Sequence, residues 1–269
     1  MSAESYEVFA IRYGHVDRRA SENFLGGCPC DGPMPMDYHL WVARSANRTV
    51  VVDTGFSPAE GARRGRTLVI PVGAALAALD VDPATVDDVV LTHLHYDHAG
   101  NLGLFPRARF HVQECELQFV AGEAMADPTT AAAYARADVQ ETVRLVQANR
   151  VRFAGEDEEL LPGLSVHLVG GHTGGTQVVR VTTERGPLVL ASDAAHFYAN
   201  LERRHVFPVT YAPDDLVDAY DRRLPGFVAD PTDIIPGHDP LVLALYPAAG
   251  EGLEGRVALL SRGRRSSPG

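Results

Sequence analysis

The chain has 269 residues, of which 45% are hydrophobic, so it is long and apolar enough to bury one sizeable core. Its formal net charge of −11 at pH 7 argues against nucleic acid as a partner, because phosphate contacts need clusters of Lys and Arg. Neither a secretion signal nor an apolar stretch of the roughly 18 residues that span a bilayer is recognisable, so we expect a cytoplasmic protein with no membrane partner.

The N-terminal part of the chain predicts a β-rich region that one long loop interrupts. Short runs of β-branched and aromatic residues predict strands over residues 7–12, 37–43 and 49–53. The intervening residues 15–36 are rich in Gly, Pro and Asn, and loops of this length are often functional. We expect this loop to line the mouth of a site, where its apolar side chains Phe24, Met34 and Met36 contact a substrate, unless they pack into the core.

A cluster of metal-ligating residue types follows the apolar residues 89–91, which predict a buried strand. Three histidines and one carboxylate fall within six residues, at His93, His95, Asp97 and His98. Neutral imidazole and carboxylate are good ligands for first-row metals. On extended backbone, His93 and His95 point to the same side and can bind one metal together. Asp97 and His98 come after the turn and can bind at a second position beside it.

The remaining elements alternate between helices and strands. Helices are predicted at residues 71–79, 114–121, 130–149 and 213–224, and strands at residues 109–112, 165–169, 176–182, 188–192 and 233–236. In the helix over residues 130–149, Val139, Val143 and Val146 recur at helical spacing and predict the buried face. We expect this helix to cover the site together with the long loop.

The clustered histidines and the segments that follow them resemble the metallo-β-lactamase superfamily. Residues 92–98 resemble its first motif, and three later segments match its remaining motifs in the family's order, at Gly170–Thr176, Ala191–Asp193 and Pro236–Asp239. The resemblance implies an α/β fold of one domain, an αβ/βα four-layer sandwich with two sheets between helices. We assign residues 1–255 to this domain and expect residues 256–269, rich in Arg, Ser and Gly, to form a flexible tail.

The resemblance also implies two adjacent divalent metal ions, with zinc as the first choice and manganese, iron or cobalt as alternatives. The implied ligands are His93, His95 and His172 for one ion, Asp97, His98 and His238 for the other, and Asp193 as the bridge between them. With this set, a hydroxide that bridges the two metals would attack a carbonyl substrate, and Asp97 could relay a proton. Asp53 would lie behind the metal histidines and fix one imidazole tautomer, unless it only caps its own turn.

Among the activities of this family, the motifs favour the N-acyl homoserine lactonases, which open the lactone ring of bacterial quorum signals. β-Lactamases usually lack an aspartate at the position of Asp97, glyoxalase II enzymes carry an additional helical domain, and flavo-diiron proteins need a flavodoxin domain. The better-known lactonases have a tyrosine three residues after the bridging aspartate, where it donates to the substrate carbonyl. Here His196 holds that position, so His196 or Tyr198 is expected to take that role, unless neither does and the metals alone stabilise the oxyanion.

Three other functions stay open at the level of sequence. The first is a hydrolase of another small-molecule lactone, ester or amide. The second is a metal-dependent oxidoreductase, and the third is a binding protein on an inactive hydrolase fold. The sequence is compatible with a monomer and with a homodimer.

Overall fold

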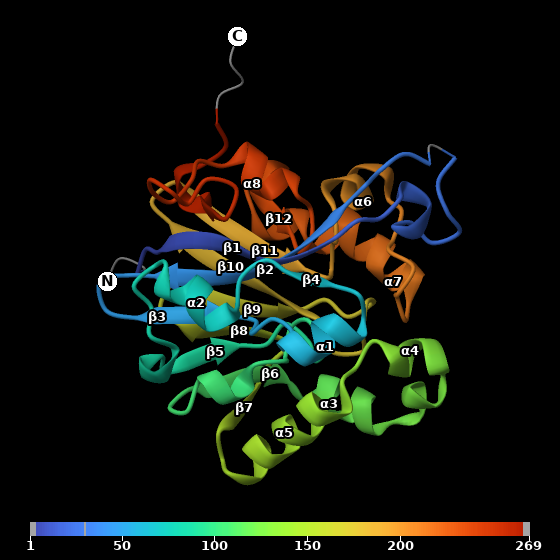
Figure 1. Ribbon diagram of the computed structural model, residues 1–269, viewed down its shortest axis with the longest axis horizontal. Coiled ribbons are helices and arrows are strands. Elements are labelled where there is room, and N and C mark those ends of the chain that lie inside the picture. Colours follow the sequence, from blue (N-terminus) through green and yellow to red (C-terminus); the bar gives the residue numbers. More distant parts are fainter. Residues whose placement is uncertain (1–3, 30, 266–269) are drawn as a thin grey trace.

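Two β-sheets face each other, and helices cover the outer face of each, so the chain folds as four layers (Figure 1). The computed structural model describes residues 4–29 and 31–265 of the chain. This arrangement is the αβ/βα sandwich that the resemblance implies, so the predicted fold class is confirmed.

The first sheet has eight strands, in the order β13-β1-β2-β3-β5-β6-β7, with β4 paired to β1. They are β1 (Glu7–Val16), β2 (Met36–Arg44), β3 (Thr49–Val52), β4 (Thr67–Leu68), β5 (Asp88–Val90), β6 (Arg109–Gln113), β7 (Val151–Ala154) and β13 (Val257–Leu259). β1, β2 and β3 are antiparallel neighbours, whereas β3, β5, β6 and β7 run parallel. The parallel strands therefore present their carboxyl ends at one edge of the sheet.

The second sheet has five strands, in the order β12-β11-β10-β9-β8. They are β8 (Asp157–Leu161), β9 (Leu164–Leu168), β10 (Gln177–Thr183), β11 (Gly186–Ser192) and β12 (Ile234–Pro236). All neighbours are antiparallel except β11 and β12, which run parallel, so these two strands also end at the same edge.

Eight α-helices are present in the described part of the chain. They are α1 (Pro58–Arg63), α2 (Val72–Ala77), α3 (Glu114–Ala121), α4 (Pro128–Ala132), α5 (Arg136–Gln147), α6 (Tyr198–Arg203), α7 (Pro213–Asp218) and α8 (Leu241–Leu245). The helices α2, α3 and α5 pack on the outer face of the first sheet, and α7 packs on the outer face of the second. None of these helices has the length and apolar character needed to cross a bilayer.

The period-2 alternation of strand residues separates the core into layers. On β3, Val50 and Val52 pack between the sheets, whereas Val51 points to the helices on the other face. On β11, Val189 faces the outer helices and Leu190 faces the first sheet. All five side chains are completely buried, as expected for strands that are covered on both faces.

The strands predicted over residues 37–43 and 49–53 are confirmed as β2 and β3, which pair as a hairpin with Arg44 opposite Thr49. The long loop is shorter than predicted, because β1 continues to Val16 and β2 begins at Met36. The strand β8, which begins at Asp157, was not among the predicted elements.

The single helix predicted over residues 130–149 is wrong, because the chain breaks between α4 and α5. Arg64 donates to the carbonyl oxygens of Ala132 and Tyr134. These oxygens therefore bind a side chain in place of the backbone N–H groups that would continue the helix. The predicted buried face is also wrong in part: Val143 is 40% exposed, and Leu145 is the buried residue on this turn. Tertiary contacts of the break therefore override the local helical pattern.

The flexible tail predicted from residue 256 is also wrong for the part that the structure describes. Val257–Leu259 form β13, which pairs antiparallel with β1 at the edge of the first sheet. Leu260 follows and is completely buried between the sheets. Because the segment is rich in Arg, Ser and Gly, the sequence analysis did not recognise that these four apolar residues belong to the fold. Residues 266–269 of the predicted tail lie outside the described residues.

Because Leu260 belongs to the core between the sheets, Leu260→Ala should lower the free energy of unfolding by about 2–5 kcal/mol. The matched control is Leu241→Ala, since Leu241 is 50% exposed and its truncation should cost less than about 0.5 kcal/mol. Urea unfolding of both variants and the parent measures this difference. Equal stability of the two variants would contradict the placement of the C-terminal segment in the fold.

Candidate metal centre

The residues predicted as metal ligands all follow the carboxyl ends of strands at one edge of the two sheets. His93, His95, Asp97 and His98 lie on the loop that leaves β5. His172 lies on the loop after β9, while Asp193 and His238 directly follow β11 and β12. Strand ends of this kind are the usual places for ligand sites in α/β folds.

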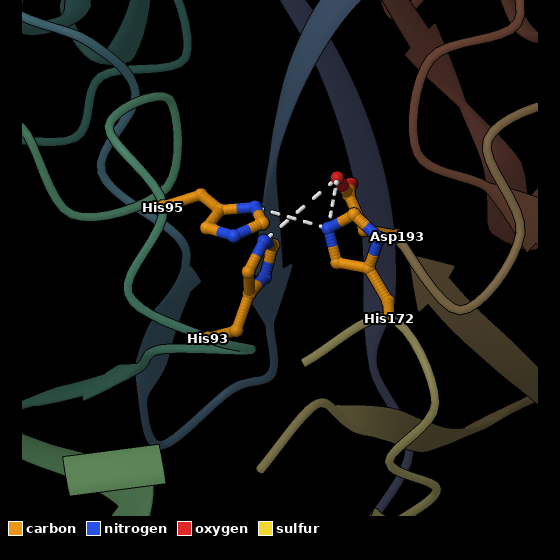
Figure 2. Close-up of side chains that lie close together, drawn as sticks. All are labelled: His93, His95, His172 and Asp193. Carbon is orange, nitrogen blue, oxygen red and sulfur yellow. Dashed lines mark hydrogen bonds and ion pairs between the residues drawn. The ribbon is translucent and has the colours of Figure 1, made fainter. Parts of the chain in front are cut away.

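The first group of side chains contains three histidines and one aspartate, which point toward one another (Figure 2). His93 and His95 come from one loop, and His172 and Asp193 come from two others. His172 Nε2 lies 3.0 Å from His95 Nδ1 and 3.2 Å from Asp193 Oδ2. His93 Nε2 lies 3.8 Å from the same carboxylate oxygen. The ligand atoms of the four residues are all within 4.8 Å of one another, so one ion could contact them together.

The second group contains Asp97, His98 and His238, whose ligand atoms also lie within 4.8 Å of one another. Asp97 Oδ2 is 3.6 Å from His98 Nε2 and 3.8 Å from His238 Nε2. All three residues are buried, so these polar atoms face each other and not bulk water.

The carboxylate of Asp193 joins the two groups. Its Oδ1 lies 3.2 Å from His98 Nε2 and 2.9 Å from His238 Nε2, both in the second group. Its Oδ2 faces His93 and His172 in the first group. One oxygen for each group is the geometry expected of a carboxylate that bridges two adjacent ions.

The charge and hydrogen bonding of the cluster fit divalent metal ions. His93 Nε2 and His98 Nε2 are buried without a hydrogen-bond partner, and both point into the cluster. Burial lowers the pKa of His93 and of His95 well below the usual range, so these rings are neutral donors of electron pairs. Neutral imidazoles and carboxylates without thiolate suit zinc and other first-row metals.

The buried carboxylates around His98 favour a positive charge at the centre of the cluster. Burial lowers the pKa of His98, but the carboxylates of Asp193, Asp97 and Asp53 outweigh burial and raise this pKa well above its usual value. Without a metal ion, these carboxylates therefore favour the protonated form of the His98 ring. A bound metal ion would supply this positive charge in its place.

Asp53 lies behind His98, as the sequence predicts for a carboxylate that fixes an imidazole. Its Oδ2 is 2.8 Å from His98 Nδ1, which leaves Nε2 of this ring free for the cluster. Its two oxygens also accept from the backbone N–H and the hydroxyl of Thr92. Asp53 has a φ of 63°, a left-handed conformation that Asp tolerates better than most residues.

A buried glutamate that the sequence analysis missed holds two of the ligand loops together. Glu116, on α3, is completely buried and accepts from Leu94 N, Tyr134 Oη, Thr173 Oγ1 and Gly175 N. The 91–98 loop and the loop of His172 are thereby fixed to one carboxylate. A Cβ on Gly175 would lie 2.3 Å from Glu116 N, so this close approach requires glycine. Only the glycine pair in the motif could have indicated such a contact.

A cavity of about 250 Å³ opens directly onto the cluster. Its wall includes the metal-site residues His95, Asp97, His172 and Asp193. Its polar lining comes from Arg18, Tyr38, Arg64, Arg66 and Tyr96, and its apolar lining from Met36, Ala132, Ala133, Phe207 and Val209. The long N-terminal loop and α4 therefore contribute to this cavity. The sequence analysis did not identify any of the three arginines.

The structure separates the two residues expected to replace the lactonase tyrosine. His196 lines the cavity, and its Nε2 lies 3.1 Å from Asp193 Oδ2. Its ring stacks on Phe207 at 3.8 Å between centroids. Tyr198 instead packs into the core between the sheets, where the guanidinium of Arg264 lies 4.7 Å above its ring. The structure thus brings His196, and not Tyr198, to the cluster.

The three apolar residues expected to contact a substrate also lie in different places. Met36 is buried and lines the cavity. Phe24 is buried against His205, which follows α6, with ring centroids 5.0 Å apart. Met34 is half-buried against the core of the first sheet. The loop composition predicted apolar anchors correctly but did not show which of them faces the site.

Comparisons with known proteins agree with this geometry. A model of the metallo-beta-lactamase superfamily matches residues 37–238. The N-acyl homoserine lactonase AiiB of Rhizobium rhizogenes is 30% identical over 178 residues, which cover 60% of this chain and 63% of that protein. The match therefore spans less than two thirds of that relative.

Two solved structures show the same fold. A quorum-quenching N-acyl homoserine lactone lactonase superposes with a TM-score of 0.71 at 19% identity, covering 88% of this chain and 93% of that one. AidC, a dizinc quorum-quenching lactonase in complex with a product, superposes with a TM-score of 0.69 at 16% identity, covering 88% of this chain and 89% of that one.

Because Asp53 orients His98, Asp53→Asn should weaken zinc binding by roughly 10- to 100-fold while the fold is retained. The matched control is Asp80→Asn, because Asp80 is exposed and has a similar φ of 57°. Competition with a chromophoric chelator measures the affinity, and far-UV circular dichroism measures the fold. Unchanged zinc affinity of Asp53→Asn would show that the contact to His98 does not organise the site.

Proposed function

The chain belongs to the metallo-beta-lactamase superfamily, and from this premise we propose that it is a metal-dependent hydrolase that opens the ring of N-acyl homoserine lactones. The observation that carries the proposal is the division of the Asp193 oxygens between two groups of histidines at the wall of a cavity. The relative named above as an N-acyl homoserine lactonase supports the choice of substrate.

We propose two divalent ions in this site. One ion would be held by His93, His95 and His172. The other ion would be held by Asp97, His98 and His238, and Asp193 would bind both ions. When bound, such ions polarise a carbonyl oxygen and lower the pKa of bound water to about 7. Zinc is our choice of metal, supported by the absence of thiolate among these ligands and by the likeness to a dizinc lactonase.

The protein side chains would orient the substrate and move its proton. Asp97 lines the cavity and is placed to accept a proton and return it to the leaving oxygen. Met36, Phe207 and Val209 offer an apolar wall for an acyl chain. We also propose that the partner of the protein is a small molecule and that the protein is cytoplasmic.

His196 is best placed to hold the bridging carboxylate. Burial lowers the pKa of His196 to about 3, against the opposing effect of Asp193, so the ring is neutral and has one N–H. That N–H donates to Asp193 Oδ2 when it is on Nε2. A ring that uses its N–H in this way cannot also donate to a substrate carbonyl, so we propose a positioning role in place of the donor role predicted from the sequence.

Removal of the metals should abolish lactone hydrolysis. We expect the zinc-loaded protein to open N-hexanoyl homoserine lactone, to lose this activity on dialysis against a chelator, and to regain it in proportion to zinc until about two ions are bound per chain. The measurement is proton release in weak buffer, combined with metal analysis of each sample. Full activity of metal-free protein, or no ring opening by fully loaded protein, would overturn the proposed function.

The positioning role of His196 predicts that His196→Phe weakens zinc binding by roughly 10- to 100-fold as well as lowering kcat. Tyr198→Phe is the matched aromatic control, since Tyr198 packs away from the cavity, and it should keep the parent's zinc affinity. A donor to the substrate would behave differently: kcat would fall about 10²-fold with zinc affinity unchanged. That second pattern would contradict the positioning role.

A further inference from the structure

Two arginines of the cavity wall lack a carboxylate partner. Among the described residues, no carboxylate oxygen lies within ion-pair distance of Arg18 or Arg66, although both line the cavity. The neighbouring Arg64 differs, because its Nε lies 2.6 Å from Glu60 and its remaining nitrogens donate to carbonyl oxygens of the α4–α5 break. Arg64 is thus neutralised within the protein, whereas the other two are not.

The contacts of Arg18 hold its side chain over the cavity but leave hydrogen-bonding capacity. Its Nη2 donates to the carbonyl oxygen of Glu22 at 2.5 Å, and its Nη1 lies 3.8 Å from Met36 Sδ. Its guanidinium lies 5.0 Å above the ring of Phe207, which is another cavity residue. Its Nε is buried without a partner. A guanidinium has five N–H donors, so most of this group is unused.

Arg66 is held from the opposite side by tyrosines. Its Nε donates to Tyr96 Oη at 3.3 Å, and Tyr96 Oη donates in turn to Tyr38 Oη at 3.1 Å. The nearest carboxylate in the cavity is that of Asp97, but this group faces His98 and His238 in the cluster. The terminal nitrogens of Arg66 have no hydrogen bond within the described residues.

The two guanidiniums are partly buried and have different surroundings. Burial lowers the pKa of Arg18, and the charge of Arg66 adds to this effect against the opposing effects of Tyr38 and Glu22. Burial also acts to lower the pKa of Arg66, but Tyr38, Tyr96 and Asp97 outweigh burial and raise it. Both side chains therefore remain charged. The chain as a whole carries a net charge of −11, so this local positive charge is not part of a generally basic surface. Guanidinium forks match the geometry of an oxyanion, which would relieve the repulsion.

We propose that the substrate carries a carboxylate, in addition to its lactone, that binds between Arg18 and Arg66. This inference rests on the proposed lactone hydrolysis, and it predicts that anionic lactones have a higher kcat/KM than neutral ones. Ring opening forms a further carboxylate from the scissile carbonyl, so the test uses a charge that the substrate carries before hydrolysis. An acyl chain that is entirely neutral would leave the remaining N–H groups of both guanidiniums to water.

The test compares lactones that differ only in this charge. The probes are N-malonyl, N-succinyl and N-glutaryl homoserine lactone, each paired with its neutral terminal carboxamide. With zinc-loaded protein we expect kcat/KM for at least one carboxylate to exceed that of its carboxamide by roughly 10- to 100-fold, mainly through KM. The ratio should fall towards one in both Arg18→Met and Arg66→Met.

The matched control is Arg63→Met, which removes the same charge from a side chain that is 61% exposed and paired with Glu60. It should keep the parent's preference, and metal content and melting temperature are measured for every variant. Neutral lactones hydrolysed as fast as every anionic partner would overturn this inference and leave the proposed function standing. A preference that survives in both cavity variants would also overturn it. Absence of hydrolysis on all probes would overturn both proposals.

Discussion

The site depends on one buried carboxylate whose two oxygens serve different groups. Asp193 presents Oδ1 to His98 and His238 and Oδ2 to His93 and His172, at distances of 2.9–3.8 Å. This is possible because β5, β11 and β12 all end at one edge of the facing sheets, so loops distant in sequence meet there. A buried carboxylate in this position needs positive charge beside it, which divalent ions held by these histidines would supply.

Two further buried carboxylates hold this arrangement in place from outside. Asp53, in a left-handed conformation after β3, orients His98 and binds the start of the ligand loop through Thr92. Glu116 ties the same loop to the loop of His172 through backbone and hydroxyl donors. Both are fully hydrogen-bonded, so their burial costs less than the burial of an isolated charge would. The rigidity of the ligand loops therefore comes from polar contacts as much as from the apolar core.

The sequence predicted the candidate site better than it predicted the helices. Clustered histidines at the end of an apolar strand indicate a metal site directly, because the residue types and their spacing are the properties that metal binding requires. The break after α4 could not be read from the sequence, since it depends on Arg64, which is distant in the chain. Tyr198 and Phe24 were misplaced for a related reason: composition shows that a residue is apolar or polar, but not which way it points. The four-layer topology itself came from family resemblance.

The most direct test of the account is a crystal structure of the zinc-loaded protein with anomalous differences recorded on both sides of the zinc edge. The account predicts two zinc peaks about 3.5–4 Å apart, one beside each oxygen of Asp193. The peak near Oδ2 should be bound by His93, His95 and His172, and the other by Asp97, His98 and His238. A single peak, or an ion held by His196 in place of these ligands, would contradict the account.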